Sequence, residues 1–319
     1  MTPPPLRIWT LTTGEAGMRT QAFGLAEAVA AQTQAEIEEK TVRPRRPWRW
    51  LPGHWAPRRL ALLLENPEDF APPLPGLVIA CGRRSIPAAL ALRKAGVFTV
   101  YVQKPDCPPD RFDLVAAPRH DGLSGPNVLQ TRGSIHRVTT AKLADAAAEW
   151  RPRFARFPRP WVAVLVGGKS RAYDFGADDA RALAAKLRAL ADAGHSLLVT
   201  TSRRTGAENT AILRTALPDA WIWSGEADGP NPYFGLLALA DHVVATCDSA
   251  NMLTEACFTG KPVHVAELPG GTVRFRRFLE GLYADGCARR FTGPPLAAWT
   301  YAPPDDRAAV AAAILARLP

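Results

Sequence analysis

Short apolar runs alternate with longer amphipathic segments along the whole chain. Runs of a few apolar residues are typical of buried strands, and an apolar position at every third or fourth residue is typical of a helix. Regular alternation of the two favours parallel sheets, because parallel strands are joined by helical crossovers that cover both faces. The pattern therefore predicts an α/β fold with parallel sheets.

The first half of the chain fits one such sheet. The predicted strands lie within 6–14, 35–42, 77–82, 98–103, 112–118 and 128–133, and the predicted helices at roughly 19–32 and 84–95. A break follows at 151–160, RPRFARFPRP, where three prolines and four arginines predict an exposed hinge. We therefore expect an N-terminal Rossmann-like, acceptor-side domain at 1–155.

The second half repeats the alternation. The predicted strands lie within 161–170, 196–206, 220–225, 242–249 and 262–268, and the predicted helices at 177–193, 207–216, 233–240, 251–260 and 275–286. This order predicts a C-terminal Rossmann-like, nucleotide-binding domain at 160–303. The last segment, 304–319, has the pattern of an amphipathic helix that could pack on either half.

Composition narrows the location of the protein. No apolar run approaches the roughly 18 residues that a membrane-spanning helix needs, and residues 1–13 lead into a strand pattern instead of a signal peptide. The five cysteines include no CxxC pair, which argues against a disulfide framework or a zinc site. We expect a cytoplasmic protein, with peripheral attachment to the inner membrane as an option.

The positive charge is unevenly distributed. Residues 1–160 hold 23 Lys and Arg against 14 Asp and Glu, whereas residues 161–319 hold 16 of each, so the whole net charge of +9 comes from the first half. Within it, Arg43 to Leu60 has six arginines, three tryptophans and no acid. Such a segment suits an anionic membrane surface, although a solvated loop with its tryptophans tucked against the domain is the slightly preferred alternative. Nucleic acid is not an expected partner, because no nucleic-acid-binding motif accompanies the segment.

Polar loops follow three predicted strands of the second half, at the sheet edge where open α/β folds bind ligands. The loops are GGKSRAY at 167–173, TTSRRTG at 200–206 and DSANMLTE at 248–255. Glycine has no side chain, so an anion can approach the backbone N–H groups closely. The paired N–H donors of arginine match phosphate oxygens, and the N-terminus of a helix attracts negative charge. Ordinary tight turns are the alternative for each loop taken singly, but three together on one edge favour a nucleotide diphosphate.

Individual roles follow from this placement. Asp248 would repel phosphate, so it is expected to cap the following helix or to bond a hydroxyl; Glu255 is expected to reach a ribose diol, or else to lie on the helix surface. The candidate nucleotide-binding and phosphate-binding residues are Gly167, Gly168, Lys169, Ser170, Ser202, Arg203, Arg204, Thr205, Asn231, Tyr233, Ser249, Asn251 and Glu255.

The first half supplies candidates for proton transfer. Glu15 lies in a glycine-flanked turn between a strand and a helix and is the preferred general base. His120 and Asp121 follow another strand, where a capped loop is the alternative, and Lys104 is a weaker candidate. The chain has no HExxH or GxSxG motif, so a hydrolase lacks its nucleophile.

With these motifs placed, the chain resembles a family of bacterial and plant mitochondrial-fission proteins whose fold is similar to that of the GT-B glycosyltransferases. The resemblance is carried by TTGEAGMRTQAFGLAEA, FDLVAAPRHDGLSGPNVLQTRGSIHRVT, VLVGGKS, TTSRRTG, NPYFGLLALAD, DSANMLTEACFTGKPV and FTG. It implies two Rossmann-like domains facing across a cleft, with the helix at 304–319 returning to the first. By position, Glu255 matches the ribose-binding glutamate of that fold, and Gly167, Gly168 and Ser249 match diphosphate-binding groups.

The combined reading predicts a GT-B-like glycosyltransferase that takes a nucleoside-diphosphate sugar as donor and a membrane-associated cell-envelope acceptor. No metal site and no cofactor is expected, because the DxD motif of metal-dependent transferases is missing. No obligate protein partner is predicted. A non-catalytic membrane-surface adaptor and a nucleotide-sugar epimerase are the alternatives.

Overall fold

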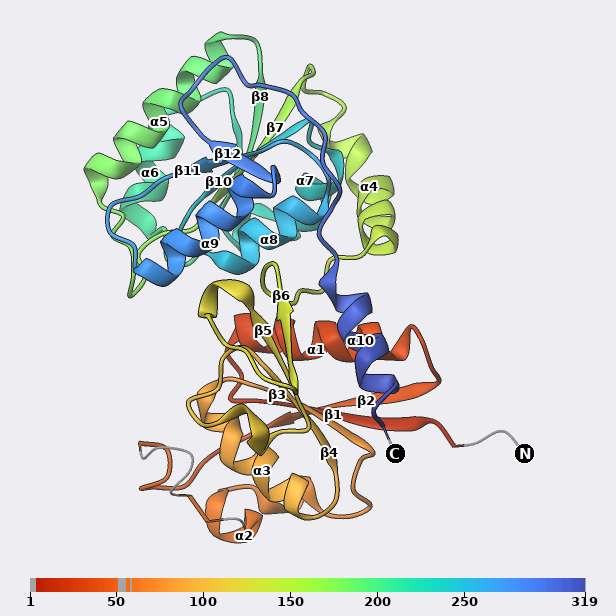
Figure 1. Ribbon diagram of the computed structural model, residues 1–319. Helices are drawn as coiled ribbons and strands as arrows, with labels where there is room; N and C mark the ends of the chain where they lie inside the picture. The colour runs from red at the N-terminus through yellow and green to blue at the C-terminus, as the bar shows by residue number, and fades with distance from the viewer. Residues whose placement is uncertain (1–3, 51–55, 58, 319) are drawn as a thin grey trace. The chain divides into compact units, whose positions relative to one another are not determined.

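The chain forms two compact α/β units in a computed structural model that describes residues 4–50, 56–57 and 59–318 (Figure 1). One unit comprises Met1–Arg137 with Asp305–Pro319, and the other comprises Val138–Pro304. Each contains a six-stranded sheet in which every pairing between the named strands is parallel. The predicted fold class is therefore confirmed.

The first unit has the strand order β2-β1-β3-β4-β5-β6. Its strands are β1 Leu6–Thr12, β2 Ala35–Thr41, β3 Leu77–Cys81, β4 Phe98–Val102, β5 Leu114–Pro118 and β6 Val128–Thr131. Its helices are α1 Ala16–Ala30, α2 Leu60–Leu63, α3 Ile86–Lys94 and α10 Asp306–Leu315. The apolar run of β3 is fully buried, whereas β2, at the edge, carries four charged residues and is half-buried or exposed.

Two layers of helices cover this sheet. α1 and α10 pack against one face, and α2 and α3 contribute to the core on the other (Figure 1). Gly24, in the middle of α1, has no room for a side chain, because a Cβ there would lie 2.4 Å from the carbonyl oxygen of His136. The C-terminal helix is tied to the same unit by Asp306, which accepts a hydrogen bond from the backbone N–H of Arg132 at 2.6 Å.

The second unit has the strand order β12-β11-β10-β7-β8-β9. Its strands are β7 Trp161–Val166, β8 Ser196–Thr201, β9 Trp221–Trp223, β10 His242–Thr246, β11 Val263–Ala266 and β12 Ala288–Arg290. Its helices are α4 Thr140–Phe154, α5 Ala177–Asp192, α6 Ala207–Ala216, α7 Tyr233–Leu239, α8 Ala250–Phe258 and α9 Val273–Ala284. The six residues of β7 are all buried and alternate between two cores, one beneath α5 and α6 and the other beneath α4, α7, α8 and α9.

The predicted exposed hinge at 151–160 is wrong in its first part. Residues 151–154 continue α4, and the aromatic side chains of Trp150 and Phe154 are buried in the core of the second unit. Gly235 of α7 has no Cβ to collide with the Trp150 ring, and the rings of Phe154 and Trp221 meet edge to face at 5.3 Å. Burial of two aromatic residues spaced four apart outweighs the proline within the helix, so the structure divides the chain after Arg137 instead of near 155.

Candidate functional site

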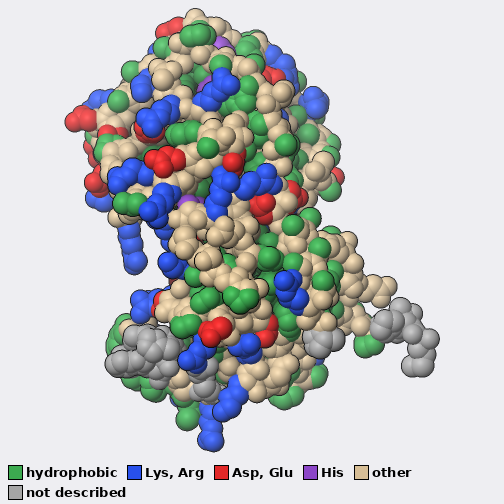
Figure 2. All heavy atoms as spheres, in the orientation of Figure 1, with side chains coloured by type: hydrophobic (Ala, Val, Ile, Leu, Met, Phe, Trp, Pro, Cys, Tyr) green, Lys and Arg blue, Asp and Glu red, His purple; other side chains and the backbone are tan. Residues whose placement is uncertain are grey.

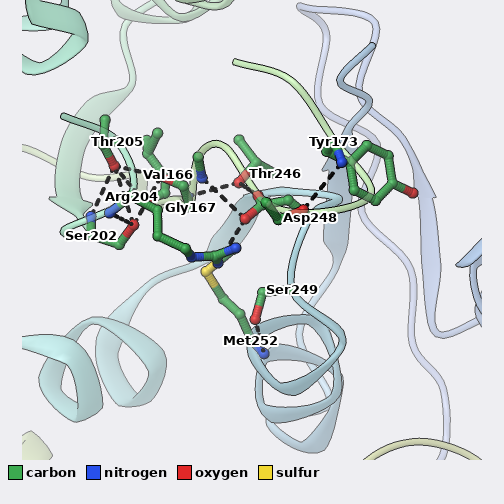
Figure 3. Close-up of polar contacts among 12 residues, drawn as sticks. Val166, Gly167, Tyr173, Ser202, Arg204, Thr205, Thr246, Asp248, Ser249 and Met252 are labelled. Atoms are coloured by element: carbon green, nitrogen blue, oxygen red, sulfur yellow. Dashed lines mark hydrogen bonds and ion pairs between the residues drawn. The ribbon is translucent and has the colours of Figure 1, made fainter. Parts of the chain in front are cut away.

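Asp248 joins two loops at the carboxyl edge of the second sheet (Figure 3). β7 and β10 are neighbouring parallel strands, so the loops that follow them lie side by side. The buried carboxylate of Asp248 accepts hydrogen bonds from the Gly168 backbone N–H at 3.0 Å and from the Thr246 hydroxyl at 2.6 Å. Thr246 in turn accepts a hydrogen bond from the Gly167 N–H at 2.8 Å. Asp248 therefore bonds a hydroxyl, as one of its two predicted roles required.

Packing accounts for the two glycines after β7. A Cβ on Gly167 would lie 2.2 Å from the Asp248 carboxylate, and one on Gly168 would lie 2.2 Å from the carbonyl oxygen of Arg204. Gly168 also has a φ of +153°, which disfavours any side chain. The backbone N–H groups of both glycines are bonded to protein acceptors. The turn after β7 therefore connects the loop after β8 to the loop after β10.

The loop after β8 is tied to the same centre (Figure 3). The Arg204 guanidinium lies 2.7 Å from Asp248 Oδ2, and its side chain is 41% exposed while the carboxylate is fully buried. Ser202 Oγ donates to the Gly167 carbonyl at 2.9 Å, and Thr205 Oγ1 donates to the same carbonyl. These two hydroxyls and Arg204 thus hold the loops in place.

Lys169 and Ser170 complete the glycine-rich loop. Ser170 Oγ accepts hydrogen bonds from the backbone N–H groups of Ala172 and Tyr173 at 3.2 and 3.1 Å, which closes a turn. Lys169 is 74% exposed and its Nζ lies 3.5 Å from Asp174. An exposed pair of this kind contributes little stability.

A pocket of about 580 Å³ opens at the carboxyl ends of β7, β8 and β9. Its lining comprises Val166, Thr200, Thr201, Ser202, Arg203, Trp223, Ser224, Gly225, Glu226, Asn231, Tyr233 and Met252. Arg203 has no acidic partner within the described part of the chain, in contrast to Arg204. A smaller pocket of about 400 Å³ adjoins it and shares Thr201, Ser202, Arg203 and Ser224. The structure therefore brings Ser202, Arg203, Asn231 and Tyr233 of the predicted set together around one cavity.

Glu255 lies behind this pocket, not on the helix surface. It is 8% exposed, and the Tyr233 hydroxyl donates to Glu255 Oε2 at 2.6 Å. Burial raises the pKa of Glu255 to about 7, and the hydrogen bond from Tyr233 opposes that shift. Asn231 Oδ1 accepts a hydrogen bond from the Tyr233 backbone N–H at 3.0 Å, so these residues run from the pocket wall into the protein.

The start of α8 is capped by Ser249, not by Asp248. Ser249 Oγ accepts a hydrogen bond from the Met252 backbone N–H at 3.3 Å, so the predicted capping role of Asp248 is wrong (Figure 3). The side chain of Asp248 is instead turned towards β7 and the loop after β8. Asn251 lies in the first turn of α8 and is half-buried. The helix nevertheless directs the positive end of its dipole to this edge of the sheet.

The proton-transfer candidates of the first unit lie on one sheet edge but apart from each other. Glu15 follows β1, and its carboxylate accepts a hydrogen bond from the Thr13 hydroxyl at 2.5 Å. His120 and Asp121 follow β5, are both buried, and have their side chains 3.6 Å apart. Three strand spacings separate β1 from β5, or roughly 14 Å at about 4.8 Å each. The strand order therefore places Glu15 and His120 at separate points of this sheet edge.

Gln103, which was not predicted, and Lys104, the weaker candidate, lie in the gap between Glu15 and His120. Gln103, directly after β4, has a φ of +88°, the only positive φ at a non-glycine residue in the described part of the chain. Its amide donates to Gln21 Oε1 at 3.3 Å, and the neighbouring Lys104 donates from Nζ to the Asp121 carbonyl at 3.3 Å. Strained backbone at a strand end is a feature of functional sites, but no sequence signal marks it. In the second unit, Trp223 and Met252 were similarly missed as pocket residues.

The basic segment from Arg43 to Leu60 is described in part, since 51–55 and 58 lie outside the described residues. Trp48 is partly buried against the core of the first unit, as the tucked-loop alternative requires. Trp50 is 59% exposed, with the guanidinium carbons of Arg46 and Arg49 at 5.2 and 5.9 Å from its ring centre. Among the described residues, no helix has the length and apolar character needed to cross a membrane.

Known proteins resemble this chain in sequence and in fold. Mitochondrial fission protein ELM1 of Arabidopsis thaliana is 34% identical over 272 residues, which cover 75% of this chain and 63% of the plant protein. A putative UDP-N-acetylglucosamine 2-epimerase from Listeria monocytogenes superposes with a TM-score of 0.57 at 14% identity, covering 98% of this chain and 89% of the other. A UDP-glucosyltransferase from Polygonum tinctorium superposes with a TM-score of 0.55 at 11% identity, covering 93% and 86%.

The structural neighbours establish the architecture, and the sequence match establishes the family. Two parallel-sheet units in this arrangement of strands form a fold like that of GT-B glycosyltransferases and related epimerases. The family model for Mitochondrial fission ELM1 matches residues 16–318, nearly the whole chain. The chain therefore belongs to the mitochondrial fission ELM1 family.

Proposed function

We propose that the second unit binds a nucleoside-diphosphate sugar in its 580 Å³ pocket and that the protein is a glycosyltransferase of the GT-B type. The observation that carries the proposal is the convergence of Arg203, Trp223 and Tyr233 on a single cavity at the carboxyl ends of parallel strands, with Glu255 hydrogen-bonded to Tyr233 behind the cavity wall. A cation without an acidic partner, an aromatic ring and a carboxylate are the groups that suit phosphate, base and ribose. The fold supports the proposal, because solved proteins of this architecture include one named as a UDP-glucosyltransferase.

Each group has a distinct role in the proposal. The guanidinium of Arg203 has paired N–H donors that match the oxygens of a phosphate. Binding a phosphate costs little free energy here, because Arg203 does not first have to break an ion pair with a buried carboxylate. Trp223 is held by a hydrogen bond from its indole N–H to the Gly229 carbonyl at 3.0 Å and offers an aromatic surface to the base. The backbone N–H groups at the start of α8 lie at the helix end that attracts the diphosphate. Tyr233 lines the pocket and holds one oxygen of the buried Glu255 carboxylate, and we assign the ribose hydroxyls to this pair.

The reaction requires a bond between the sugar and the diphosphate to break while an acceptor hydroxyl attacks the sugar. Negative charge then develops on the leaving diphosphate, and fixed cations and N–H groups stabilise it without reorganisation. The attacking hydroxyl loses its proton to a base, for which Glu15 is the proposed group and His120 the alternative. Metal independence is part of this proposal, and an unchanged transfer rate in the presence of a chelator would support it.

Isothermal titration calorimetry with UDP, GDP, ADP and dTDP, followed by the corresponding sugars, tests the donor site. One nucleotide should bind, and Arg203→Ala should weaken it roughly ten- to a hundredfold, the effect expected for a hydrogen bond to a charged group. Arg181→Ala is the matched control, because Arg181 is 62% exposed on α5 and lies outside both pockets. Equal weakening by both substitutions, or no binding of any nucleotide at millimolar concentration, would remove the basis of the proposal.

An activity assay distinguishes the alternatives. Release of the nucleoside diphosphate with transfer of the sugar to a cell-envelope fraction supports a transferase, and conversion of the bound sugar to its epimer identifies an epimerase. Nucleotide binding with neither product identifies an adaptor that retains the fold.

We also propose that the exposed part of the basic segment in the first unit, Arg46 to Trp50, attaches the protein to an anionic membrane surface. The supporting observation is that Trp50 is mostly exposed while two guanidinium groups lie near its ring. Tryptophan prefers the headgroup level, and arginine is attracted to anionic lipid. Loss of vesicle binding on Trp50→Ala, with no loss on Trp48→Ala, would support this attachment.

A further inference from the structure

Two segments of the second unit are joined into one surface. The segment at 169–174 follows β7, and the segment at 269–277 leads into α9. Asp174 N–H donates to the Pro269 carbonyl at 3.0 Å, and Gly271 N–H donates to the Ala172 carbonyl at 2.5 Å. The rings of Tyr173 and Phe275 also meet edge to face at 5.2 Å. The positions of the side chains on the two segments are therefore fixed relative to each other.

This surface is strongly cationic. Its exposed basic residues are Lys169, Arg171, Arg274, Arg276 and Arg277. The one acid in the two segments, Asp174, is paired with Lys169 at 3.5 Å. Arg276 and Arg277 make no ion pair within the described part of the chain, and Lys and Arg side chains gather over α9 in Figure 2. We call these five residues and Val273 the α9 basic surface.

The position of the arginines on α9 is unfavourable for the helix itself. Three of its first five residues are arginines, and its first turn has no acid to balance them. Positive charge at a helix N-terminus is repelled by the helix dipole. The apolar residues Phe278, Leu279 and Leu282 hold the opposite side of the helix in the core. The core therefore anchors charges that the helix alone would disfavour. Because Arg276 and Arg277 have no ion pair among the described residues to offset these charges, their position favours an anionic partner.

The exposure of Val273 indicates which kind of anion the α9 basic surface binds. It is 55% exposed, one of three large apolar side chains found this exposed in the described residues, and it adjoins Arg274 in the first turn of α9. An aliphatic side chain among arginines gains from contact with the headgroup and acyl boundary of a bilayer, whereas a nucleic-acid backbone offers it nothing comparable. None of the α9 basic surface lines either of the two pockets described above, so this surface lies outside the proposed donor site.

We propose that the α9 basic surface docks the second unit onto an anionic lipid bilayer. This docking does not depend on the proposed transferase activity, and it involves a different unit from the segment around Trp50. Each basic side chain near an anionic leaflet strengthens binding about fivefold, so three arginines contribute roughly a hundredfold. The contact is electrostatic and shallow, because most apolar residues of α9 face the core.

Co-sedimentation with vesicles of phosphatidylcholine containing phosphatidylglycerol, and with pure phosphatidylcholine, tests the proposal on the full chain. The variant Arg274→Gln, Arg276→Gln, Arg277→Gln should lose binding to the anionic vesicles roughly a hundredfold. The matched control is Arg181→Gln, Lys186→Gln, Arg188→Gln, which removes the same charge from α5, where Arg181 and Arg188 are paired with Asp178 and Asp192. Val273→Ser should weaken binding without any change of charge.

Several results separate this surface from the other possibilities. Equal losses in the two triple variants would attribute binding to net charge and overturn the proposal, as would preference for DNA oligonucleotides over anionic vesicles. Loss with Trp50→Ala but not with the α9 variant would assign the membrane contact to the first unit alone. Far-ultraviolet circular dichroism and thermal unfolding confirm that each variant is folded. Unchanged nucleotide affinity in the α9 variant would show that the donor pocket is intact.

Discussion

The carboxylate of Asp248 occupies the space that a side chain on Gly167 would need. A Cβ at that position would lie 2.2 Å from Asp248 Oδ2 and 2.5 Å from its carboxyl carbon. Because the carboxylate is buried and bonded to two other loops, it has little freedom to move away. Glycine at 167 is thus a requirement of packing around a buried charge.

We expect Gly167→Ala to destabilise the second unit by about 1–3 kcal/mol, the usual cost of overpacking a core. Urea unfolding followed by circular dichroism measures the change. Gly176→Ala is the control, because Gly176 has a negative φ and a Cβ there would meet nothing nearer than 3.7 Å; its cost should stay below about 1 kcal/mol. Equal costs at the two positions would contradict the packing argument.

The Asp248–Arg204 pair should show strong coupling in a double-mutant cycle. Its carboxylate is fully buried, so Asp248→Asn and Arg204→Gln should couple by about 1–3 kcal/mol in the free energy of unfolding. The exposed Lys169–Asp174 pair in the adjacent loop provides the comparison, and its coupling should be about 0–1 kcal/mol. A larger coupling for the exposed pair would show that Asp248 does not organise the loops.

Glu255 should make stability fall as the pH rises. Its pKa is raised from 4.5 to about 7 in the folded state, so its contribution is complete below about pH 4.5 and is lost as the pH rises through 7. The difference amounts to about 3 kcal/mol, since one pKa unit corresponds to about 1.4 kcal/mol. Unfolding measured from acid to mildly alkaline pH checks this, and Glu255→Gln should remove the dependence.

Tyr233→Phe provides the complementary test of the same pair. The Tyr233 hydroxyl lowers the pKa of Glu255, so its removal should raise that pKa further and move the loss of stability to higher pH. If nucleotide binding uses the Glu255 carboxylate, affinity should increase as the pH rises through 7 in the wild type and through a higher pH in the variant. An unchanged pH profile would show that the two side chains do not interact in solution.

His264 should have the opposite pH dependence. The pKa of His264 is lowered from 6.5 to about 4, mainly by burial and to a smaller extent by the neighbouring His242 and Arg289. The folded state therefore favours the neutral ring, and this contribution to stability is present above about pH 6.5 and lost as the pH falls towards 4. NMR titration of the imidazole signals gives the pKa directly, and His264→Phe should flatten the acid limb of the stability profile.

Gln103→Gly should be more stable than Gln103→Ala by about 1 kcal/mol, because glycine adopts a φ near +88° without the penalty that a Cβ brings. Both substitutions remove the contact with Gln21, so their difference isolates the backbone strain. Thermal unfolding of the two variants measures it. Equal stability would show that the turn after β4 relaxes in solution.

The sequence alone predicted most of the strands and helices, the parallel sheets and the family, but it predicted neither α4 nor β12. A fully apolar strand such as β7 is buried on both faces, which requires a layer of helices on each side of the sheet. The position of such a strand can therefore be predicted from a short stretch of sequence. The site residues were partly readable for the same reason: the pocket opens where three predicted strands end, and Arg203, Asn231 and Tyr233 line it.

Only the tertiary structure decided which polar groups face the pocket and which hold the loops. Arg203 and Arg204 are adjacent and chemically identical, yet Arg204 pairs with the buried carboxylate of Asp248, in a loop more than forty residues later in the chain. The sequence likewise did not show that α4 belongs to the second unit, because this depends on the packing of Trp150 against Gly235. Hydrophobic periodicity is a property of a short segment, whereas hydrogen-bond partners and free volume come from distant segments that only the folded chain brings together.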